Sequence, residues 1–206
     1  MSTATIQPPS PLAPPDAGPY RMTVDEFERI ADSLDRRVEL VDGTLMERPE
    51  MSAPHVLLIA RLRSRLERTV PQGWHVREEK AIRIPDYNAR LPDVSVVRGH
   101  FEDYPTQHPL PKDVALLVEV ALTSLGHDQG LKLALYGSQG VPVYWIVNVK
   151  AGQIEVYAGP GAAGYSACLT YKPGESVPVM IDGVEVGRIA VADILPSKPA
   201  AESNWT

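Results

Sequence analysis

Apolar and polar residues follow two different periods along the chain, and these periods separate predicted helices from predicted strands. Apolar residues three and four positions apart mark helices over 24–34, 54–69 and 125–139. Alternating or continuously apolar runs mark strands at 38–41, 44–47, 74–84, 91–97, 114–120, 143–149 and 153–158, and strands and turns continue to about 186. This order predicts an α/β (α+β) fold in which helices pack on a mixed central sheet, with a β-rich C-terminal part.

Capping and turn residues support the first of these elements. Thr23 and Glu26 stand three positions apart where the first helix begins, which is the spacing of a capping box. Pro54 suits the first turn of the second helix, where a backbone N–H is not needed. Asp42-Gly43 joins two β-rich runs and predicts a hairpin with a type I′ turn.

Two later segments are assigned by pattern alone. In the third predicted helix, we expect Leu131, Ala134 and Leu135 to face the core. Residues 85–90 are rich in turn formers, and 99–113 contains several prolines, so both segments are expected to be irregular.

The two ends of the chain differ from its middle. Six of the first twenty residues are proline, which fixes φ and lacks a backbone donor. We therefore expect 1–20 to be a disordered proline-rich arm, although a polyproline ligand for a partner is an alternative. With a loose tail at 196–206, this leaves 21–195 as a single domain.

Composition excludes several classes of protein. The net charge of -6 argues against a basic protein held on nucleic acid by bulk charge. The only cysteine, Cys168, excludes an internal disulfide and a zinc site with several cysteines. No apolar run approaches the roughly 20 residues that a membrane span needs. A cytoplasmic protein without membrane contact is the expectation.

Three carboxylates interrupt apolar strands. Asp93 opens the strand 91–97, Glu119 lies in the apolar run VALLVEV, and Glu39 lies in VELV. A buried carboxylate must be paired, hydrogen-bonded or metal-bound, and two of them with a backbone carbonyl would suit Mg²⁺ or Mn²⁺. Alternatively, Glu119 and Glu39 could face solvent on alternating strands, and Asp93 could cap a turn.

The third helix adds a cation. Asp128, Lys132 and Tyr136 are four residues apart and lie on about one helix face. Lys132 could lie beside Asp93 and Glu119 and stabilise charge on a phosphate. A surface ion pair with a partly packed tyrosine explains the same spacing.

The second helix carries a basic stripe made of Arg61, Arg65 and Arg68. These arginines are candidates for contacts with a nucleic-acid backbone. A solvated helix face with Glu67 nearby is the simpler interpretation.

Taken together, these residues resemble the Uma-two family of restriction endonucleases, within the PD-(D/E)XK nuclease superfamily. The resemblance runs in order from about residue 21 to 195. It is carried by MTVDEF (22–27), VELVDG (38–43), His55, LPDVSVV (91–97), LLVEV (116–120), Asp128, Lys132, LY (135–136) and GVPVYWIVN (140–148).

The resemblance implies a restriction-endonuclease-like core in which Asp93 and Glu119 bind the metal. The superfamily usually has a lysine two residues after the second acid, but this chain has Ala121 there. The family supplies the lysine from the following helix, which points to Lys132. Positions near the family's site have supporting roles here: Glu39, His55, Asp128 and Tyr136.

These observations lead to a hypothesis of Mg²⁺- or Mn²⁺-dependent hydrolysis of nucleic acid, DNA rather than RNA. Asp93, Glu119 and the carbonyl of Val120 would hold the ion, and Lys132 would position a water or stabilise charge. A homodimer would suit cleavage of two strands. The alternative is a nuclease fold without catalysis that acts as a binding module. A sugar hydrolase is disfavoured by an aromatic content of only 6 %.

Overall fold

The computed structural model describes residues 18–31, 33–34 and 37–195. Almost all of the predicted arm at 1–20 and the whole predicted tail at 196–206 lie outside the described residues.

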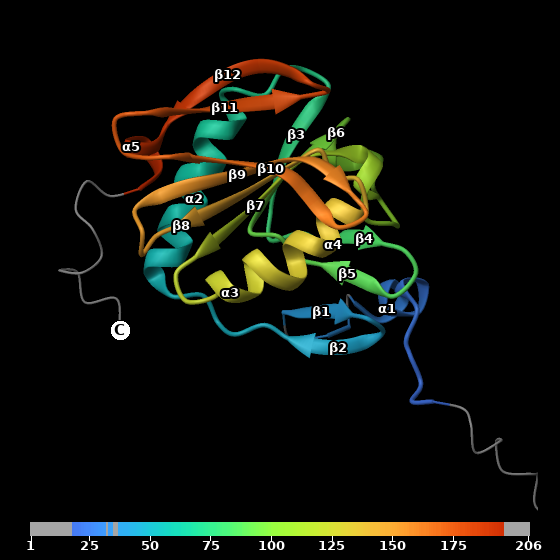
Figure 1. Cartoon of the computed structure of the whole chain (residues 1–206). Helices are drawn as coiled ribbons and strands as arrows, with labels where there is room; N and C mark the ends of the chain where they lie inside the picture. The colour runs from blue at the N-terminus through green and yellow to red at the C-terminus, as the bar shows by residue number, and fades with distance from the viewer. Residues whose placement is uncertain (1–17, 32, 35–36, 196–206) are drawn as a thin grey trace, which may run out of the picture.

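The helices and strands occur in the predicted order (Figure 1). The helical elements are α1 (Val24–Ala31), α2 (Ala53–Glu67), the short 3-10 turns η1 (Phe101–Asp103) and η2 (Pro111–Asp113), α3 (Leu125–His127), the π-helical segment η3 (Asp128–Lys132), α4 (Leu133–Ser138) and α5 (Val191–Ile194). The strands are β1 (Val38–Val41), β2 (Thr44–Glu47), β3 (Trp74–Glu78), β4 (Ile82–Ile84), β5 (Asn88–Arg90), β6 (Val94–Arg98), β7 (Val114–Ala121), β8 (Val143–Asn148), β9 (Gln153–Gly161), β10 (Gly164–Tyr171), β11 (Ser176–Ile181) and β12 (Val184–Ala190).

A six-stranded mixed sheet forms the centre of the fold, with the strand order β10-β9-β8-β7-β6-β3. Its strands β7 and β8 run parallel, and its other neighbours are antiparallel. A four-stranded sheet (β2-β1-β5-β4) and the hairpin β11-β12 flank it. The mixed sheet with flanking helices confirms the predicted fold class.

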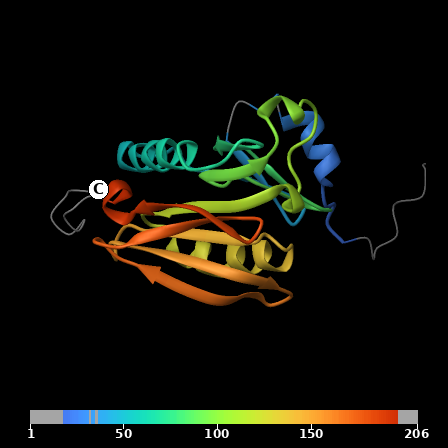
Figure 2. The same cartoon turned by 90° about the horizontal axis from the view of Figure 1, so that it is seen from above.

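Helices cover the two faces of the six-stranded sheet (Figure 2). The buried stripe of α2 packs on one face, together with the hairpin β11-β12, through Leu58, Ile59, Leu62 and Leu66. On the other face, Tyr136 of α4 packs against Leu117 and Tyr144. Each fully buried leucine of the stripe contributes about 1.5–3 kcal/mol by leaving water. The strands between these layers are therefore buried on both sides, which explains the continuous apolar run of β7.

The local signals at the N-terminal elements are confirmed. Thr23 accepts from the backbone N–H of Glu26 at 3.3 Å, and its own N–H donates to the Glu26 carboxylate at 2.8 Å, which is the capping box. At the hairpin, Asp42 and Gly43 have φ values of 47° and 81°, as a type I′ turn requires.

The third helix differs from the expectation because it contains a π-helical turn. Lys132 and Tyr136 are buried, whereas Leu131 is 64 % exposed and Ala134 is also exposed. Leu135 is half-buried. A π turn widens the helix and shifts which side chains face the sheet, so the predicted inward positions of Leu131 and Ala134 were wrong.

A smaller difference concerns the turn-rich segment 85–90. Its second half forms β5, which pairs with both β1 and β4.

Within the described residues, no helix has the length and apolarity needed to cross a membrane.

Close approach of α4 to β10 depends on a glycine. A Cβ added to Gly137 would lie 2.4 Å from the carbonyl carbon of Gly164, which leaves no room for a side chain. We expect Gly137→Ala to lower the free energy of unfolding by about 1–3 kcal/mol, measured by urea denaturation.

Gly126→Ala provides the matched control, since a Cβ on Gly126 would meet nothing within 4 Å. This variant should be neutral or slightly stabilising. Equal effects of the two substitutions would contradict the close packing of α4 on β10.

Candidate active site

Two carboxylates lie opposite each other where β6 and β7 pair. The antiparallel register joins Val94 to Val118, so the next pair in the same register is Asp93 and Glu119. Both residues are only 1 % exposed. The Asp93 Oδ2 also accepts the backbone N–H of Val120 at 2.7 Å. The two acids therefore share one face of the sheet, at the end where β6 begins.

The covering layers explain why these acids do not reach solvent. Glu119 alternates with Val118 and Val120, which point toward α2, so it points toward α4. Both faces of β7 are covered, and the solvent-facing alternative for Glu119 is therefore wrong. Glu39 is likewise buried, at 5 % exposure, because β1 is an inner strand of the four-stranded sheet.

Lys132 reaches Glu119 from the π-helical segment. Its Nζ lies 2.8 Å from Glu119 Oε2 and 3.3 Å from Asp128 Oδ1. The hydroxyl of Tyr136 donates to the other Glu119 oxygen at 3.3 Å. Lys132 is 4 % exposed and Asp128 is 1 % exposed. The group is thus a buried cluster of charges and not a pair on the helix surface.

The electrostatics of Glu119 reflect its surroundings. Burial raises the pKa of Glu119 to about 8, Lys132 opposes this change, and the nearby carboxylates of Asp93 and Asp128 add to it. Burial disfavours the charged form of Lys132, yet its pKa is raised because Glu119 and Asp128 stabilise the cation. A bound cation would relieve the same repulsion among the carboxylates.

Asp93 lies in a more positive environment. Its Oδ2 lies 2.9 Å from His55 Nε2, and its Oδ1 lies 3.4 Å from Arg48 Nη2. Burial by itself would raise the pKa of Asp93, but His55, the Val120 N–H and Arg48 outweigh burial and lower the pKa to about 2. Asp93 is therefore ionised at neutral pH.

Glu39 ties the four-stranded sheet to this site. It accepts the Leu91 N–H at 2.9 Å and lies 3.3 Å from Arg90 Nη1. Arg48 Nη1 lies 3.5 Å from Glu39 and also donates to the Leu91 carbonyl. Arg48 thus links Glu39 with Asp93.

Glu79 is a site residue that the sequence reasoning missed. It follows β3 with a φ of 52°, and its N–H donates to the Asp93 carbonyl at 3.2 Å. Burial and the Asp93 carboxyl raise the pKa of Glu79, although its partner Arg37 opposes this. In the sequence, Glu78-Glu79-Lys80 looks like an ordinary polar turn, so only the backbone geometry identifies the residue.

The donor chemistry suits a hard cation. Carboxylate oxygens of Asp93 and Glu119 are the ligands that Mg²⁺ and Mn²⁺ prefer. The Val120 N–H points toward Asp93, so its carbonyl faces the same side of the strand. As they stand, no three His, Cys, Asp or Glu side chains of the described residues are grouped closely enough to enclose an ion. Lys132, His55 and Arg48 lie against the two acids.

Comparison with known proteins assigns the family. A family model described as "Uma2: Putative restriction endonuclease" matches residues 24–191, which is more than half of the chain. The chain belongs to the Uma2 family. The match includes Asp93, Glu119 and Lys132, and it confirms the resemblance found in the sequence.

A solved structure shares the fold of this family member. The crystal structure of "a putative nuclease belonging to DUF820" from Anabaena variabilis ATCC 29413 superimposes with a TM-score of 0.60. The match covers 84 % of this chain and 97 % of that chain at 16 % sequence identity. No curated protein sequence matches the chain.

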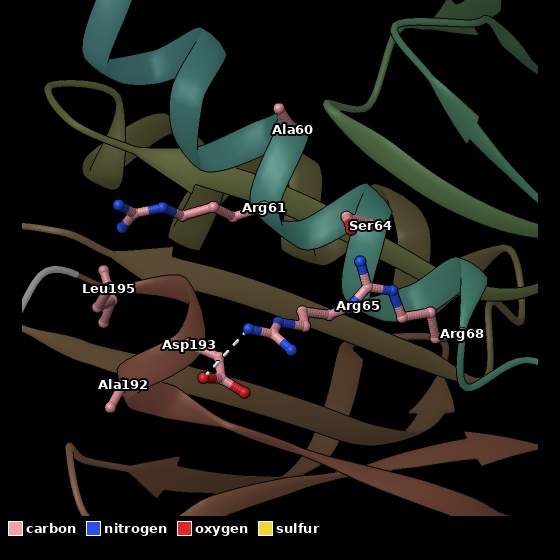
Figure 3. Close-up of a pocket in the computed structure, with 8 residues that line it drawn as sticks. All are labelled: Ala60, Arg61, Ser64, Arg65, Arg68, Ala192, Asp193 and Leu195. Atoms are coloured by element: carbon pink, nitrogen blue, oxygen red, sulfur yellow. Dashed lines mark ion pairs between the residues drawn. The ribbon is translucent and has the colours of Figure 1, made fainter.

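The arginine stripe of this Uma2 chain lies away from the acids, in a groove between α2 and α5 (Figure 3). Arg61 donates to the Ile194 carbonyl at 3.2 Å, and Arg65 lies 3.3 Å from Asp193. Figure 3 shows Arg68 further along α2. Two of the three arginines therefore hold α5 in place, which favours a structural role for them.

The raised pKa of Glu119 predicts how the metal-free protein responds to pH. Because the folded state keeps the proton that the unfolded state loses near pH 4.5, stability falls as pH rises from about 5 to about 8. Glu119→Gln abolishes this titration. The variant should therefore gain stability relative to wild type as pH rises, by up to about 1.4 kcal/mol per pH unit, in urea denaturation with EDTA.

Glu155→Gln is the control, because Glu155 is also buried but its pKa is shifted the other way. Burial raises the pKa of Glu155, yet hydrogen bonds from Asn148, Gln129 and Tyr157 outweigh burial and lower it. Its contribution is complete above its ordinary pKa, so the difference from wild type should stay constant between about pH 5 and about pH 8. A constant difference for Glu119→Gln as well would contradict the raised pKa.

Proposed function

We propose that this Uma2 chain is a metal-dependent nuclease that hydrolyses phosphodiester bonds of DNA. The observation that carries the proposal is the buried pair Asp93 and Glu119 with the Lys132 ammonium 2.8 Å from Glu119. Two acids and a lysine are the groups needed to bind a divalent cation and to stabilise a phosphate. The family description as a restriction endonuclease supports the same reaction and favours DNA as the substrate.

Asp93 and Glu119, with the Val120 carbonyl, would hold Mg²⁺ or Mn²⁺. A bound ion of this kind lowers the pKa of a coordinated water and neutralises a phosphate oxygen. Asp93 is suited to this role because His55 and Arg48 keep it ionised. Glu119 would bind as the carboxylate, so metal binding should release its proton below about pH 8.

Lys132 would act on the phosphate. With Glu119 holding the cation, Lys132 would be left to donate from Nζ to a phosphate oxygen or to an attacking water. Asp128 lies 3.3 Å away and holds the lysine close to the site. His55 and Glu39 would support the site by orienting Asp93 and the adjoining strand end.

The substrate would bind against the protein's overall charge. With a net charge of -6, long-range attraction to DNA is weak, so binding depends on local cations and the metal. A homodimer with two such sites would cut two strands, and this assembly is part of the proposal.

Calorimetric titration with Mn²⁺ and cleavage of plasmid DNA test the proposal together. Asp93→Asn and Glu119→Gln should each abolish both metal binding and cleavage, since each removes a charged ligand. Lys132→Met should bind Mn²⁺ at least as tightly as wild type, because it removes a competing cation, but should cleave about 10²–10³-fold more slowly.

Lys150→Met is the control, because Lys150 is an exposed lysine in the turn after β8. It should behave like wild type in both measurements. If wild type gives no heat with Mg²⁺ or Mn²⁺, the nuclease proposal fails and a binding module without catalysis becomes the better interpretation.

A further inference from the structure

Among the described residues, one buried cation outside the acidic site has no carboxylate partner. Arg77 on β3 is 5 % exposed, and its Nε and Nη1 atoms are buried without a hydrogen-bond partner. No ion pair within the described residues uses its guanidinium. Burying a charge without a counterion costs several kcal/mol of effective desolvation. Arg77 therefore lowers the stability of the folded protein.

Two aromatic rings lie against the Arg77 guanidinium. Its carbon lies 5.3 Å from the ring centre of Phe101 and 5.6 Å from that of Tyr104. Burial lowers the pKa of Arg77, and Tyr104 is the one group that opposes the change. The rings contact the guanidinium by cation–π interaction, but its Nε and Nη1 groups have no hydrogen-bond partner among the described residues. Phe101 is 52 % exposed, so the cluster lies near the surface.

The cross-strand neighbour of Arg77 is also unsatisfied. Arg77 pairs with Ser95 in the register of β3 and β6, so their side chains are adjacent on one face. Ser95 is 1 % exposed, and its Oγ has no partner. His75, two residues before Arg77, uses Nδ1 on the Gly99 carbonyl at 2.9 Å and leaves Nε2 buried without a partner. Unsatisfied donors of Arg77 and Ser95 therefore lie on neighbouring strands on one face of the sheet, whereas the His75 Nε2 is an acceptor in the neutral ring because Nδ1 donates to Gly99.

Arg77 and Ser95 lie on the same face of the sheet as the acidic site. The Arg77 guanidinium, however, extends toward Phe101 and Tyr104, which follow β6, whereas Asp93 precedes β6. On β6, Ser95 stands two residues after Asp93 and points to the same face, and on β3, Arg77 stands two residues before Glu79. Two residues along a strand span roughly 7 Å. Each strand of DNA carries a phosphate about every 3.4 Å of axis, so a strand bound at Asp93 and Glu119 would present further phosphates along this face of the sheet.

We propose that Arg77, together with Ser95, binds a backbone phosphate of the nucleic acid other than the one that is cleaved. The free guanidinium offers the paired N–H groups that match an oxyanion, and the Ser95 hydroxyl adds a donor. This inference rests on the proposed nuclease function for its substrate. Its tests need neither metal nor cleavage and are carried out in EDTA, so they remain informative if that function fails.

The first test uses inorganic phosphate as the probe. Wild type should gain about 2–4 °C in Tm when phosphate exceeds its Kd several-fold at constant ionic strength. Arg77→Met keeps the length of the side chain but removes the charge, and it should lose this gain. Without phosphate, its Tm should equal or exceed that of wild type, because an unpaired buried charge has been removed.

Arg98→Met is the matched control. Arg98 also stacks on an aromatic ring, 4.3 Å from the centre of Trp74, but it pairs with Asp182 at 2.8 Å. This variant should keep the full phosphate effect. If Arg77→Met does not fold, Arg77→Lys takes its place and should lose most of the gain, because lysine cannot bind in a bidentate way. An equal gain in the Arg77 variant, or none in wild type, overturns the proposal.

The second test separates a nucleic-acid phosphate from free phosphate. Binding of a short fluorescent DNA is followed by anisotropy over a range of salt concentrations. Arg77→Met should bind about tenfold more weakly and lower the slope of log K against log salt by about 1, and Arg98→Met should do neither. A phosphate effect at Arg77 with unchanged DNA affinity would assign the site to free phosphate and overturn the proposed substrate contact.

Discussion

The pairing of β6 with β7 constrains the rest of the structure, because it places two carboxylates side by side in the interior. Asp93 and Glu119 are both 1 % exposed, and carboxylates so close repel each other. The fold compensates each acid from a different direction. Lys132 arrives from the helix that covers one face of the sheet, whereas Arg48 arrives from the end of the first hairpin. These contacts link three parts of the fold to the two acids: α2 through His55, the π-helical segment through Lys132, and the four-stranded sheet through Arg48.

The π-helical segment follows from this constraint. The strand itself offers no cation after Glu119, since Val120 and Ala121 are apolar, and the cation comes from the next element along the chain. The π turn directs Asp128 and Lys132 toward the sheet and leaves Leu131 exposed. Its outer side is anchored by Gln129, whose amide donates to the buried Glu155 at 2.7 Å. The apolar pattern alone would place Leu131 inward. Leaving Glu119 buried without its cation would cost more than exposing this leucine.

Much of the site could be predicted from the sequence because acids in apolar strands are physically unusual. The apolar run around Glu119 and the position of Asp93 at a strand start identify a pair that the register brings together. Glu79 could not be found in this way, because its position depends on a left-handed residue after β3. Arg48 is equally hidden, since nothing in the sequence of a hairpin end shows that its side chain turns inward. The error at Leu131 has the same origin, for a π turn leaves the 3.6-residue pattern almost unchanged while rotating the side chains.

The distribution of charge within the fold is more informative than its sum. A net charge of -6 disfavours long-range attraction to DNA. Within the described residues, however, the buried Arg77 is paired with no carboxylate. Every other strongly buried cation discussed here has an acid within 3.5 Å: Arg48, Arg90 and Lys132. Arg77 has aromatic rings instead. A fold that neutralises its cations so consistently has no structural use for an unpaired one, and an incoming phosphate would neutralise it. Long-range attraction to DNA depends on the total charge of the protein, whereas a contact between Arg77 and a phosphate depends on where the arginine lies. A weak long-range attraction is therefore compatible with a specific contact at Arg77.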